Sequence, residues 1–295
     1  MKRFSLSRGF VFRVVVTLVI VVIVALYIGM PLVMAVAATA PDGGAAGEPP
    51  QGFSEVRVPT DDGAELVGWY AEPDNGALIL VVHGAGGGRG STRSYAAMLR
   101  ERGFGVLALS VRGYDDSTGR INRLGWNGTR DIAAAMQFLQ KRESVQAVGG
   151  LGLSMGGEIL LGAASSFPTL QAIVADGATF RAVNDYIELP MNQPWYRNFT
   201  HHIFSFMVGA ISGETQPSPT LVKSIADAQT TSFLFIAAGN DDDEGLFNQM
   251  FHDAAPDRSS LWIIPQVNHT SGFSSDPAAY EQRVIEFFSA ALLDN

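Results

Sequence analysis

A serine set between two glycines is the feature of this sequence best suited to chemistry. Ser154 lies in the segment GLSMG at 152–156, after an apolar run and before a helical pattern. A tight turn from a strand into a helix can expose a serine hydroxyl when small residues stand two positions before and after it. The helix N-terminus that follows favours developing negative charge. We therefore expect Ser154 to act as a nucleophile rather than only as a helix cap.

A glycine-rich loop predicts where that negative charge would be stabilised. The run HGAGGG at 83–88 follows the apolar segment 78–82. The backbone N–H groups of Ala85 and Met155 are expected to point at a substrate oxygen, a task that needs backbone freedom rather than a particular side chain. Because no Gly-Lys-Ser or Gly-Lys-Thr follows, the loop is not expected to bind phosphate.

A hydroxyl nucleophile needs a base that takes its proton, and the chain has five histidines. His269 fits best, because it lies in a loop between an apolar strand pattern and the last helix. His83 precedes the nucleophile and is expected to anchor its own loop. The other three are less favoured by position, His201 and His202 lying in an aromatic-rich stretch and His252 on an expected helix.

The acid that would orient His269 is expected in an acidic turn, GNDDDE at 239–244, which follows the strand pattern 233–237. One of these carboxylates would hold the imidazole and stabilise its charged form, while the others cap a helix or face water. Asp176, at the end of the preceding strand pattern, is the rival. The residues alone leave this choice open.

These candidate residues stand in loops of a βαβ alternation. Such an alternation predicts an α/β fold, with a mostly parallel sheet covered by helices on both faces. A starting hairpin is expected at 56–58 and 66–70. The further strands are expected at 78–82, 106–111, 148–153, 172–175, 233–237 and 261–264, and the helices at 95–102, 131–141, from 155 onward, and at 277–292.

The stretch 180–229 breaks this alternation, because it is rich in aromatic residues and has no strong strand pattern. It is expected to form a cap inserted over the carboxyl ends of the strands. The alternative is an ordinary helical crossover whose aromatic side chains fill the core.

Charge and cysteine content exclude several classes of function. The net charge is −9, and residues 1–40 contain four basic and no acidic side chains, so the remaining 255 residues carry −13. An acidic body is repelled by the phosphate backbone, and nucleic-acid binding is not expected. The absence of cysteine excludes disulfides, thiolate nucleophiles and Cys-ligated metals. No cofactor and no metal ion are expected.

The N-terminus is expected to be a membrane anchor. Residues 14–38 contain no charged side chain, and 25 residues at about 1.5 Å each exceed the roughly 30 Å of bilayer hydrocarbon. The basic residues in 1–13 should keep that tail cytoplasmic and place the rest outside the cytoplasm. The alternative is a secretory signal cleaved near Ala37 or Ala40, which also exports the body. Residues 39–52 read as a linker, followed by one domain at 53–295.

From about Phe53 to the C-terminus the sequence resembles the α/β-hydrolases, close to their dienelactone-hydrolase-like and membrane-anchored serine-hydrolase branches. The motifs are HGAGG at 83–87, RGYDDS at 112–117, GLSMGG at 152–157, GNDD at 239–242 and NH at 268–269. The resemblance implies Ser154 as nucleophile, Asp242 as acid and His269 as base, with the amides of Ala85 and Met155 as oxyanion donors. Tyr114 stands where the family usually has a histidine after Arg-Gly, which affects packing more than chemistry.

The resemblance implies hydrolysis of a carboxylic ester through an acyl-enzyme intermediate. A serine rather than an aspartate as the nucleophile argues against epoxide opening and halide displacement. An apolar cap beside a membrane favours a small-molecule or lipid-like ester as substrate. A peptidase or a thioesterase with the same triad, or a noncatalytic hydrolase-fold binding protein at the cell envelope, are the alternatives, and the oligomeric state is not predicted.

Overall fold

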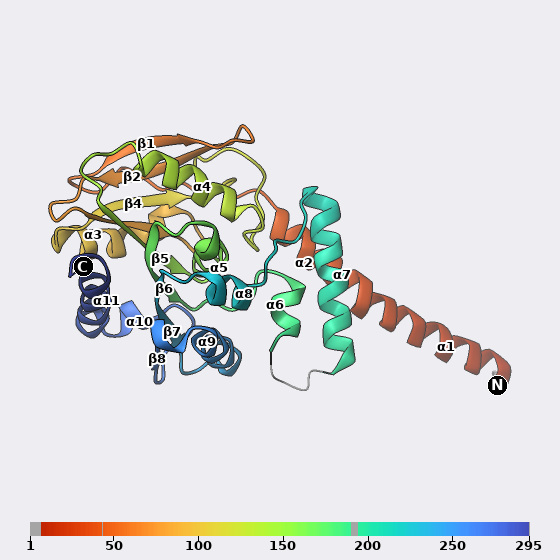
Figure 1. Ribbon diagram of the computed structural model, residues 1–295. Coiled ribbons are helices and arrows are strands. Elements are labelled where there is room, and N and C mark those ends of the chain that lie inside the picture. Colours follow the sequence, from red (N-terminus) through yellow and green to blue (C-terminus); the bar gives the residue numbers. More distant parts are fainter. Residues whose placement is uncertain (1–6, 43, 190–193, 295) are drawn as a thin grey trace.

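The computed structural model describes residues 7–42, 44–189 and 194–294, and shows a twisted sheet covered by helices with one long helix projecting from it (Figure 1). The eight strands lie in the order β1-β2-β4-β3-β5-β6-β7-β8. β1 and β2 pair antiparallel with their neighbours, and the pairs from β4 to β8 are parallel, so the expected mostly parallel sheet is confirmed. The strands are β1 Ser54–Pro59, β2 Glu65–Ala71, β3 Ala77–Val82, β4 Gly105–Ser110, β5 Ala147–Leu153, β6 Leu170–Asp176, β7 Ser232–Ala238 and β8 Ser259–Ile264.

The central strands are apolar throughout because both faces of the sheet are covered. In β3, the residues Leu78, Leu80 and Val82 pack into the core on one face, and the residues between them pack into the core on the other. Helices α3 Arg93–Glu101 and α11 Pro277–Leu292 cover one face. Helices α4 Gly128–Leu139, α5 Met155–Ala163, α8 Leu221–Asp227 and α9 Asp242–Ala254 cover the other.

The register of the parallel strands brings the candidate loops together. Val82 of β3 pairs with Gly152 of β5, and Leu153 of β5 pairs with Asp176 of β6. The loops that leave β3, β5, β7 and β8 therefore emerge at the same edge of the sheet. Short helices complete this part of the chain, at η2 Arg89–Thr92, η3 Ala164–Ser166, η4 Pro256–Arg258 and α10 Gly272–Ser275.

The stretch between β6 and β7 divides into two parts. Helix α8 packs into the core through Leu221 and Ile225, as a crossover helix would. Helix α7 Trp195–Ser212 instead packs against the N-terminal helix (Figure 1). The short helix α6 Val183–Ile187 packs against α7 and contributes Tyr186 to the core. Positions 190–193 of the expected cap lie outside the described residues.

The N-terminal helix runs from α1 Arg8–Val24 through the π-helical turn η1 Ala25–Gly29 into α2 Met30–Thr39. Within the described ranges, it is the one helix long and apolar enough to cross a membrane. Pro31 and Ala35 of α2 are buried, and α2 packs against α7. Lys2 and Arg3 of the basic tail precede the described residues.

The expected linker is tied to the domain. Its described residues after Thr39 form no helix or strand, yet Ala46 is buried and the Arg93 Nη2 atom donates to the Glu48 carbonyl at 2.6 Å. The chain thus continues along the domain surface to β1.

Candidate active site

Ser154 lies in a strained turn between β5 and α5. Its φ is 51° and its ψ is −119°, a conformation that costs energy for a residue with a Cβ atom and that persists where the surroundings impose it. A Cβ atom on Gly152 would clash with the backbone of Gly156, and one on Gly156 would clash with the carbonyl of Val82. The two glycines are therefore required by close backbone approach, as the motif predicts.

His269 reaches Ser154 from the loop after β8. Its Nε2 atom lies 2.9 Å from the Ser154 hydroxyl oxygen. Gly177 leaves room for the ring, because a Cβ atom there would lie 2.9 Å from the His269 Cε1 atom. The sequence pattern placed these two residues in different loops, and the fold brings them into hydrogen-bond distance.

The carboxylate beside His269 belongs to Glu244, so the expected choice of Asp242 is corrected. The His269 Nδ1 atom lies 2.7 Å from Glu244 Oε2, and the other carboxylate oxygen accepts the Ala238 N–H at 2.6 Å. Glu244 is fully buried, whereas Asp242 is exposed. With Nδ1–H donated to Glu244, Nε2 is left to accept the Ser154 proton.

The geometry of α9 explains the correction. The helix begins at Asp242, with the Asp241 carboxylate capping it by accepting the Glu244 N–H at 3.0 Å. At about 100° per residue, positions 242 and 244 point to nearly opposite sides of the helix. Glu244 is in helical phase with the buried Phe247 and Phe251, so it points toward the sheet. This helical phase is the signal in the sequence that could have identified Glu244.

Asp176, the rival acid, is buried and bonds to Tyr280 and to the backbone of Ser154. Its carboxylate accepts the Tyr280 hydroxyl at 2.8 Å, and its backbone carbonyl accepts the Ser154 N–H at 2.7 Å. Burial raises the pKa of Asp176 to about 7. This residue therefore supports the turn that carries Ser154.

The hydrogen bond to Glu244 raises the pKa of His269, against the opposing effect of partial burial. The His269 side chain is 45% exposed, and Glu244 beneath it is inaccessible to solvent. A buried carboxylate thus orients a partly accessible imidazole and favours its charged form.

The loop after β3 lies against Ser154 and is oriented by His83. A Cβ atom on Gly84 would lie 3.4 Å from the Ser154 Cβ. The His83 Nε2 atom accepts the Val111 N–H at 3.1 Å, so Nδ1 carries the proton and donates to the Gly84 carbonyl at 2.8 Å. In a trans peptide the carbonyl and the next N–H point in opposite directions, so this bond fixes the Ala85 N–H. Burial lowers the pKa of His83, in keeping with a neutral ring.

The second expected donor, Met155, is the first residue of α5, where backbone N–H groups have no partner within the helix. Two side chains that the sequence reading did not assign to the site hold the facing loop. The Ala85 carbonyl accepts from Arg123 Nη1 at 2.5 Å and from the Tyr114 hydroxyl at 3.2 Å. Arg123 also donates its backbone N–H to the Ala38 carbonyl at 3.0 Å, which connects the loop to the end of α2.

A hollow of about 500 Å³ opens over these groups, a size suited to a small organic ligand. Its lining consists of Gly84, Ala85, Gly86, Gly87, Ser91, Tyr95, Leu153, Ser154, His269 and Thr270. Trp195 and Phe199, two aromatic residues of the expected cap at 180–229, line a different hollow, against the N-terminal helix.

The remaining histidines make other contacts. The His201 ring lies 3.9 Å from the Tyr186 ring, and His252 Nδ1 lies 2.7 Å from the Ser259 hydroxyl oxygen. Within the part of the chain that the structure describes, no group of three or more His, Cys, Asp or Glu side chains could hold a metal ion.

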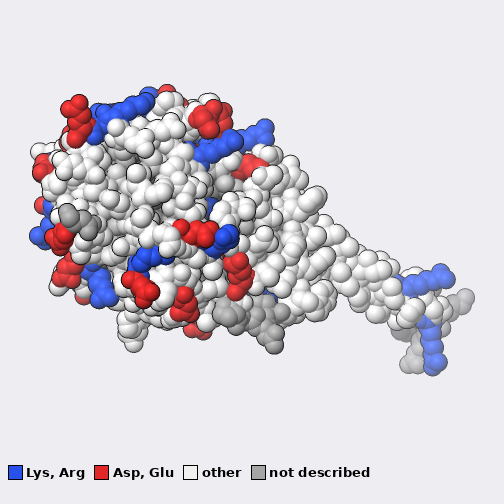
Figure 2. Space-filling view, in the orientation of Figure 1, with Lys and Arg blue, Asp and Glu red and all other residues white. Residues whose placement is uncertain are grey.

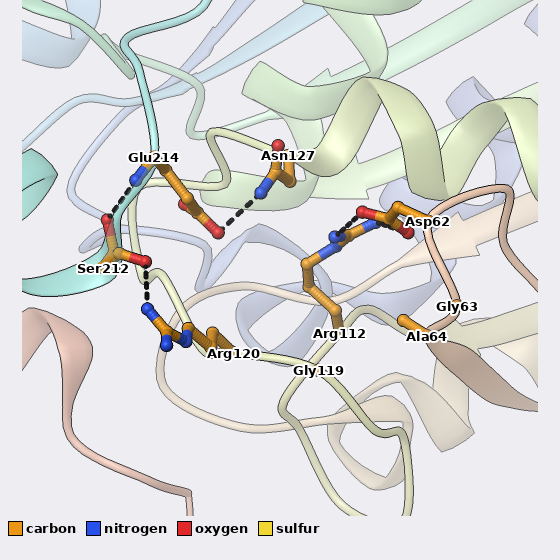
Figure 3. Close-up of a pocket in the computed structure, with 9 residues that line it drawn as sticks. All are labelled: Asp62, Gly63, Ala64, Arg112, Gly119, Arg120, Asn127, Ser212 and Glu214. Atoms are coloured by element: carbon orange, nitrogen blue, oxygen red, sulfur yellow. Dashed lines mark hydrogen bonds and ion pairs between the residues drawn. The ribbon is translucent and has the colours of Figure 1, made fainter.

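A separate cavity of about 380 Å³ is lined mostly by charged and polar groups that bond to one another (Figure 3). Arg112 lies between Asp62 and Asp131, with its closest contact to each at 2.7 Å. On the other side, Asn127 donates to Glu214 at 2.6 Å. Arg120 donates to the Ser212 carbonyl at 2.8 Å, so hydrogen bonds across this cavity connect the loop after β4 to the end of α7.

Comparison with known proteins agrees with the fold described above. A family model for the alpha/beta hydrolase fold matches residues 77–200. The mitochondrial acyl-coenzyme A thioesterase 2 of Mus musculus is 30% identical over 135 residues, which cover 44% of this chain and 29% of that enzyme. The chain thus matches less than a third of the length of this relative.

Two solved structures share the fold over most of the chain. An esterase of Pyrococcus furiosus gives a TM-score of 0.64 at 19% identity, covering 81% of this chain and 91% of the esterase. A bacterial membrane phospholipase A gives a TM-score of 0.57 at 16% identity, covering 97% of this chain and 99% of the other. The chain therefore has the α/β-hydrolase fold, with esterases among its structural neighbours.

Proposed function

We propose that this protein is a serine hydrolase that cleaves carboxylic esters through an acyl-enzyme intermediate. The observation that carries the proposal is the hydrogen-bonded series from Ser154 through His269 to the buried Glu244. A nucleophile, a base and an orienting acid in this arrangement are the components that acyl transfer to water requires. A pure binding protein has no need of all three.

In the acylation step, the Ser154 oxygen attacks the ester carbonyl carbon while its proton passes to His269 Nε2. The carbonyl oxygen becomes an oxyanion that accepts hydrogen bonds from the N–H groups of Ala85 and Met155. The carbon–oxygen bond to the alcohol then breaks, and His269 returns the proton to the leaving alcohol. Glu244 stabilises the imidazolium throughout these steps.

In deacylation, a water molecule takes the place of the alcohol. His269 removes its proton as the water oxygen attacks the acyl carbon. Collapse of the second tetrahedral intermediate breaks the bond to the Ser154 oxygen, which recovers its proton from His269. The products are a carboxylic acid and an alcohol, and no cofactor takes part.

A thioester is the second candidate substrate class. The curated relatives that match this chain include acyl-coenzyme A thioesterases, and the same chemistry cleaves an ester or a thioester. Parallel assays with p-nitrophenyl esters and acyl-coenzyme A thioesters of equal chain length distinguish the two. We expect higher kcat/KM on the esters, and a consistent preference for the thioesters would replace the proposed substrate class.

We also propose that α1 is a retained anchor, with the N-terminus in the cytoplasm and the hydrolase domain outside it, as in membrane-anchored serine hydrolases. Basic residues precede the apolar stretch, in accord with the positive-inside rule. Cleavage near Ala37 or Ala40 would remove α2, although Pro31 and Ala35 are buried in the folded protein. The mass of the mature protein tests retention, and a C-terminal reporter active only outside the cytoplasm tests orientation.

A further inference from the structure

The first turns of α7 expose a cluster of large aromatic side chains. Trp195 is 74% exposed, and Tyr196 and Phe199 are each 45% exposed. These residues stand on one short stretch of helix at the outer side of the domain (Figure 1). Contiguous apolar surface of this kind marks a contact with another phase or partner.

This aromatic cluster continues directly onto the N-terminal helix. The rings of Phe199 and Tyr27 lie 6.0 Å apart. Between the two helices is a hollow of about 490 Å³, and its lining consists of Ile23, Val24, Tyr27, Ile28, Trp195 and Phe199. Neither helix supplies a charged side chain to this hollow, so its chemistry matches that of a hydrocarbon chain.

The positions of charges along the N-terminal helix indicate where a bilayer would lie. Arg8 and Tyr27 are separated by a rise of roughly 28 Å, which is close to the approximately 30 Å of bilayer hydrocarbon. Arg13 is long enough for its guanidinium to extend toward the headgroups. Figure 2 shows charged side chains on the globular body and at the tip of the projecting helix, with an uncharged stretch between them.

Beyond Tyr27 one side of the same helix packs against the domain, while side chains on its other side, such as Val33, stay exposed. Pro31 and Ala35 are buried, and Ala35 packs in a cluster with Trp126 and Val208. Tyr27, whose ring faces Phe199, therefore marks the level at which the helix first contacts the domain. Tyrosine and tryptophan are the residues that favour the membrane interface, because one end is apolar and the other forms hydrogen bonds.

We propose that the start of α7 docks in the interface of the bilayer that α1 spans. Trp195 and Tyr196 lie at the level of the lipid headgroups, and lipid acyl chains fill the hollow between Phe199 and α1. The inference rests on the proposed anchor and names the lipid bilayer as the partner of the aromatic cluster. The domain is then held at the membrane by two elements, α1 and the start of α7.

Spin labelling tests this docking in the full-length chain, because the protein has no cysteine of its own. Single cysteines replace Trp195 or Phe199, with Ile20→Cys in α1 as the anchor reference and Glu143→Cys, an exposed position between α4 and β5, as the aqueous control. Each variant carries a nitroxide and is reconstituted in phosphatidylethanolamine–phosphatidylglycerol vesicles. Hydrolysis of a short soluble ester by each variant reports that the domain is folded.

The readout is the ratio of two collision rates of the nitroxide. One is its collision rate with oxygen, which concentrates in lipid, and the other is its collision rate with a water-soluble nickel chelate. We expect labels at 195 and 199 to favour oxygen severalfold over the Glu143→Cys label, with the Ile20→Cys label favouring it most. Labels at 195 and 199 that match the Glu143→Cys label, while Ile20→Cys reports lipid, would overturn the docking and leave the anchor standing. An Ile20→Cys label exposed to water would overturn both the docking and the anchor. The proposed ester hydrolysis is tested separately, by the activity measured on the same variants.

Discussion

Two regions of the molecule differ in how their side chains are partnered. One is the set of loops at the carboxyl ends of the strands, and the other is the layer that α7 forms with the N-terminal helix. In the loops, Ser154, His269 and Glu244 each have a hydrogen-bond partner, and the acid is fully buried. In the layer, Trp195 and Phe199 pack against one helix and leave much of their surface open. The polar groups of the first region are paired within the protein, whereas the second region exposes apolar surface, which fits the proposed contact with lipid.

The comparison predicts that substitutions in the catalytic loops abolish chemistry in any medium, while substitutions in the α7 layer act only where a membrane is present. The largest expected effect is that of Ser154→Ala. Loss of the nucleophile should lower kcat/KM for a chromogenic ester by about 10⁴-fold or more, even with the oxyanion donors in place. Thermal unfolding should be nearly unchanged, and a variant that retains most of its activity would remove Ser154 from the mechanism.

Glu244→Gln should lower kcat by about 10³- to 10⁴-fold, since an amide can favour the wrong imidazole tautomer and cannot balance the imidazolium. Asp242→Asn is the matched control, because Asp242 is exposed on the same helix and should affect kcat very little. Steady-state kinetics of both variants checks the assignment. If Asp242→Asn greatly lowered kcat and Glu244→Gln hardly changed it, the acid would be Asp242 and not Glu244.

The sequence predicted the strands that lead into the candidate site closely and the packing of α7 poorly, for physical reasons. Buried parallel strands are marked by continuous apolar runs, so β3, β5 and β7 were located within one or two residues. The acid was misplaced by two residues because a turn of successive carboxylates hides where the helix begins, and helical phase decides which of them points inward.

Arg123 shows a different limit of the sequence. Its contact with the Ala85 carbonyl joins residues 38 positions apart, and no local pattern predicts such a bond. The position of Trp195 and Phe199 was equally hidden, because a cap over the active site and a layer against the N-terminal helix have the same aromatic composition. Only tertiary structure separates those two arrangements.

The pH dependence gives a sharper test of the acid. His269 must be neutral to accept a proton, so activity should fall as pH decreases through its pKa, which Glu244 raises above the ordinary value for histidine. In Glu244→Gln the main cause of that increase is removed, and the acid limb of kcat/KM should move to lower pH. An unchanged limb in this variant would show that another group controls the profile.

Arg123→Met should lower kcat by about tenfold, less than the loss of an oxyanion donor itself, because it loosens the Ala85 carbonyl without removing the N–H group. Arg130→Met is the control, since Arg130 pairs with Asp62 at the domain surface. Equal kinetics for the two variants would mean that Arg123 does not position the loop.

The smallest effect is expected for Trp195→Ser on soluble substrate. An acetyl ester in solution should be hydrolysed within about twofold of the wild-type rate, as is usual for exposed positions away from a site. Hydrolysis of a long-chain ester embedded in vesicles should slow more, because the variant docks less well. Equal decreases in the hydrolysis rate of both substrates would mean that Trp195 affects the catalytic loops themselves, which would contradict the separation of the two regions.

The central claim is that Ser154 is the nucleophile of a serine hydrolase, and covalent labelling tests it most directly. The full-length protein is treated with a fluorophosphonate, digested, and analysed by mass spectrometry to locate the adduct. We predict a single adduct on the peptide that contains Ser154, formed slowly in Glu244→Gln and at the wild-type rate in Asp242→Asn. An adduct on another serine, or no adduct in an intact and folded protein, would contradict the claim.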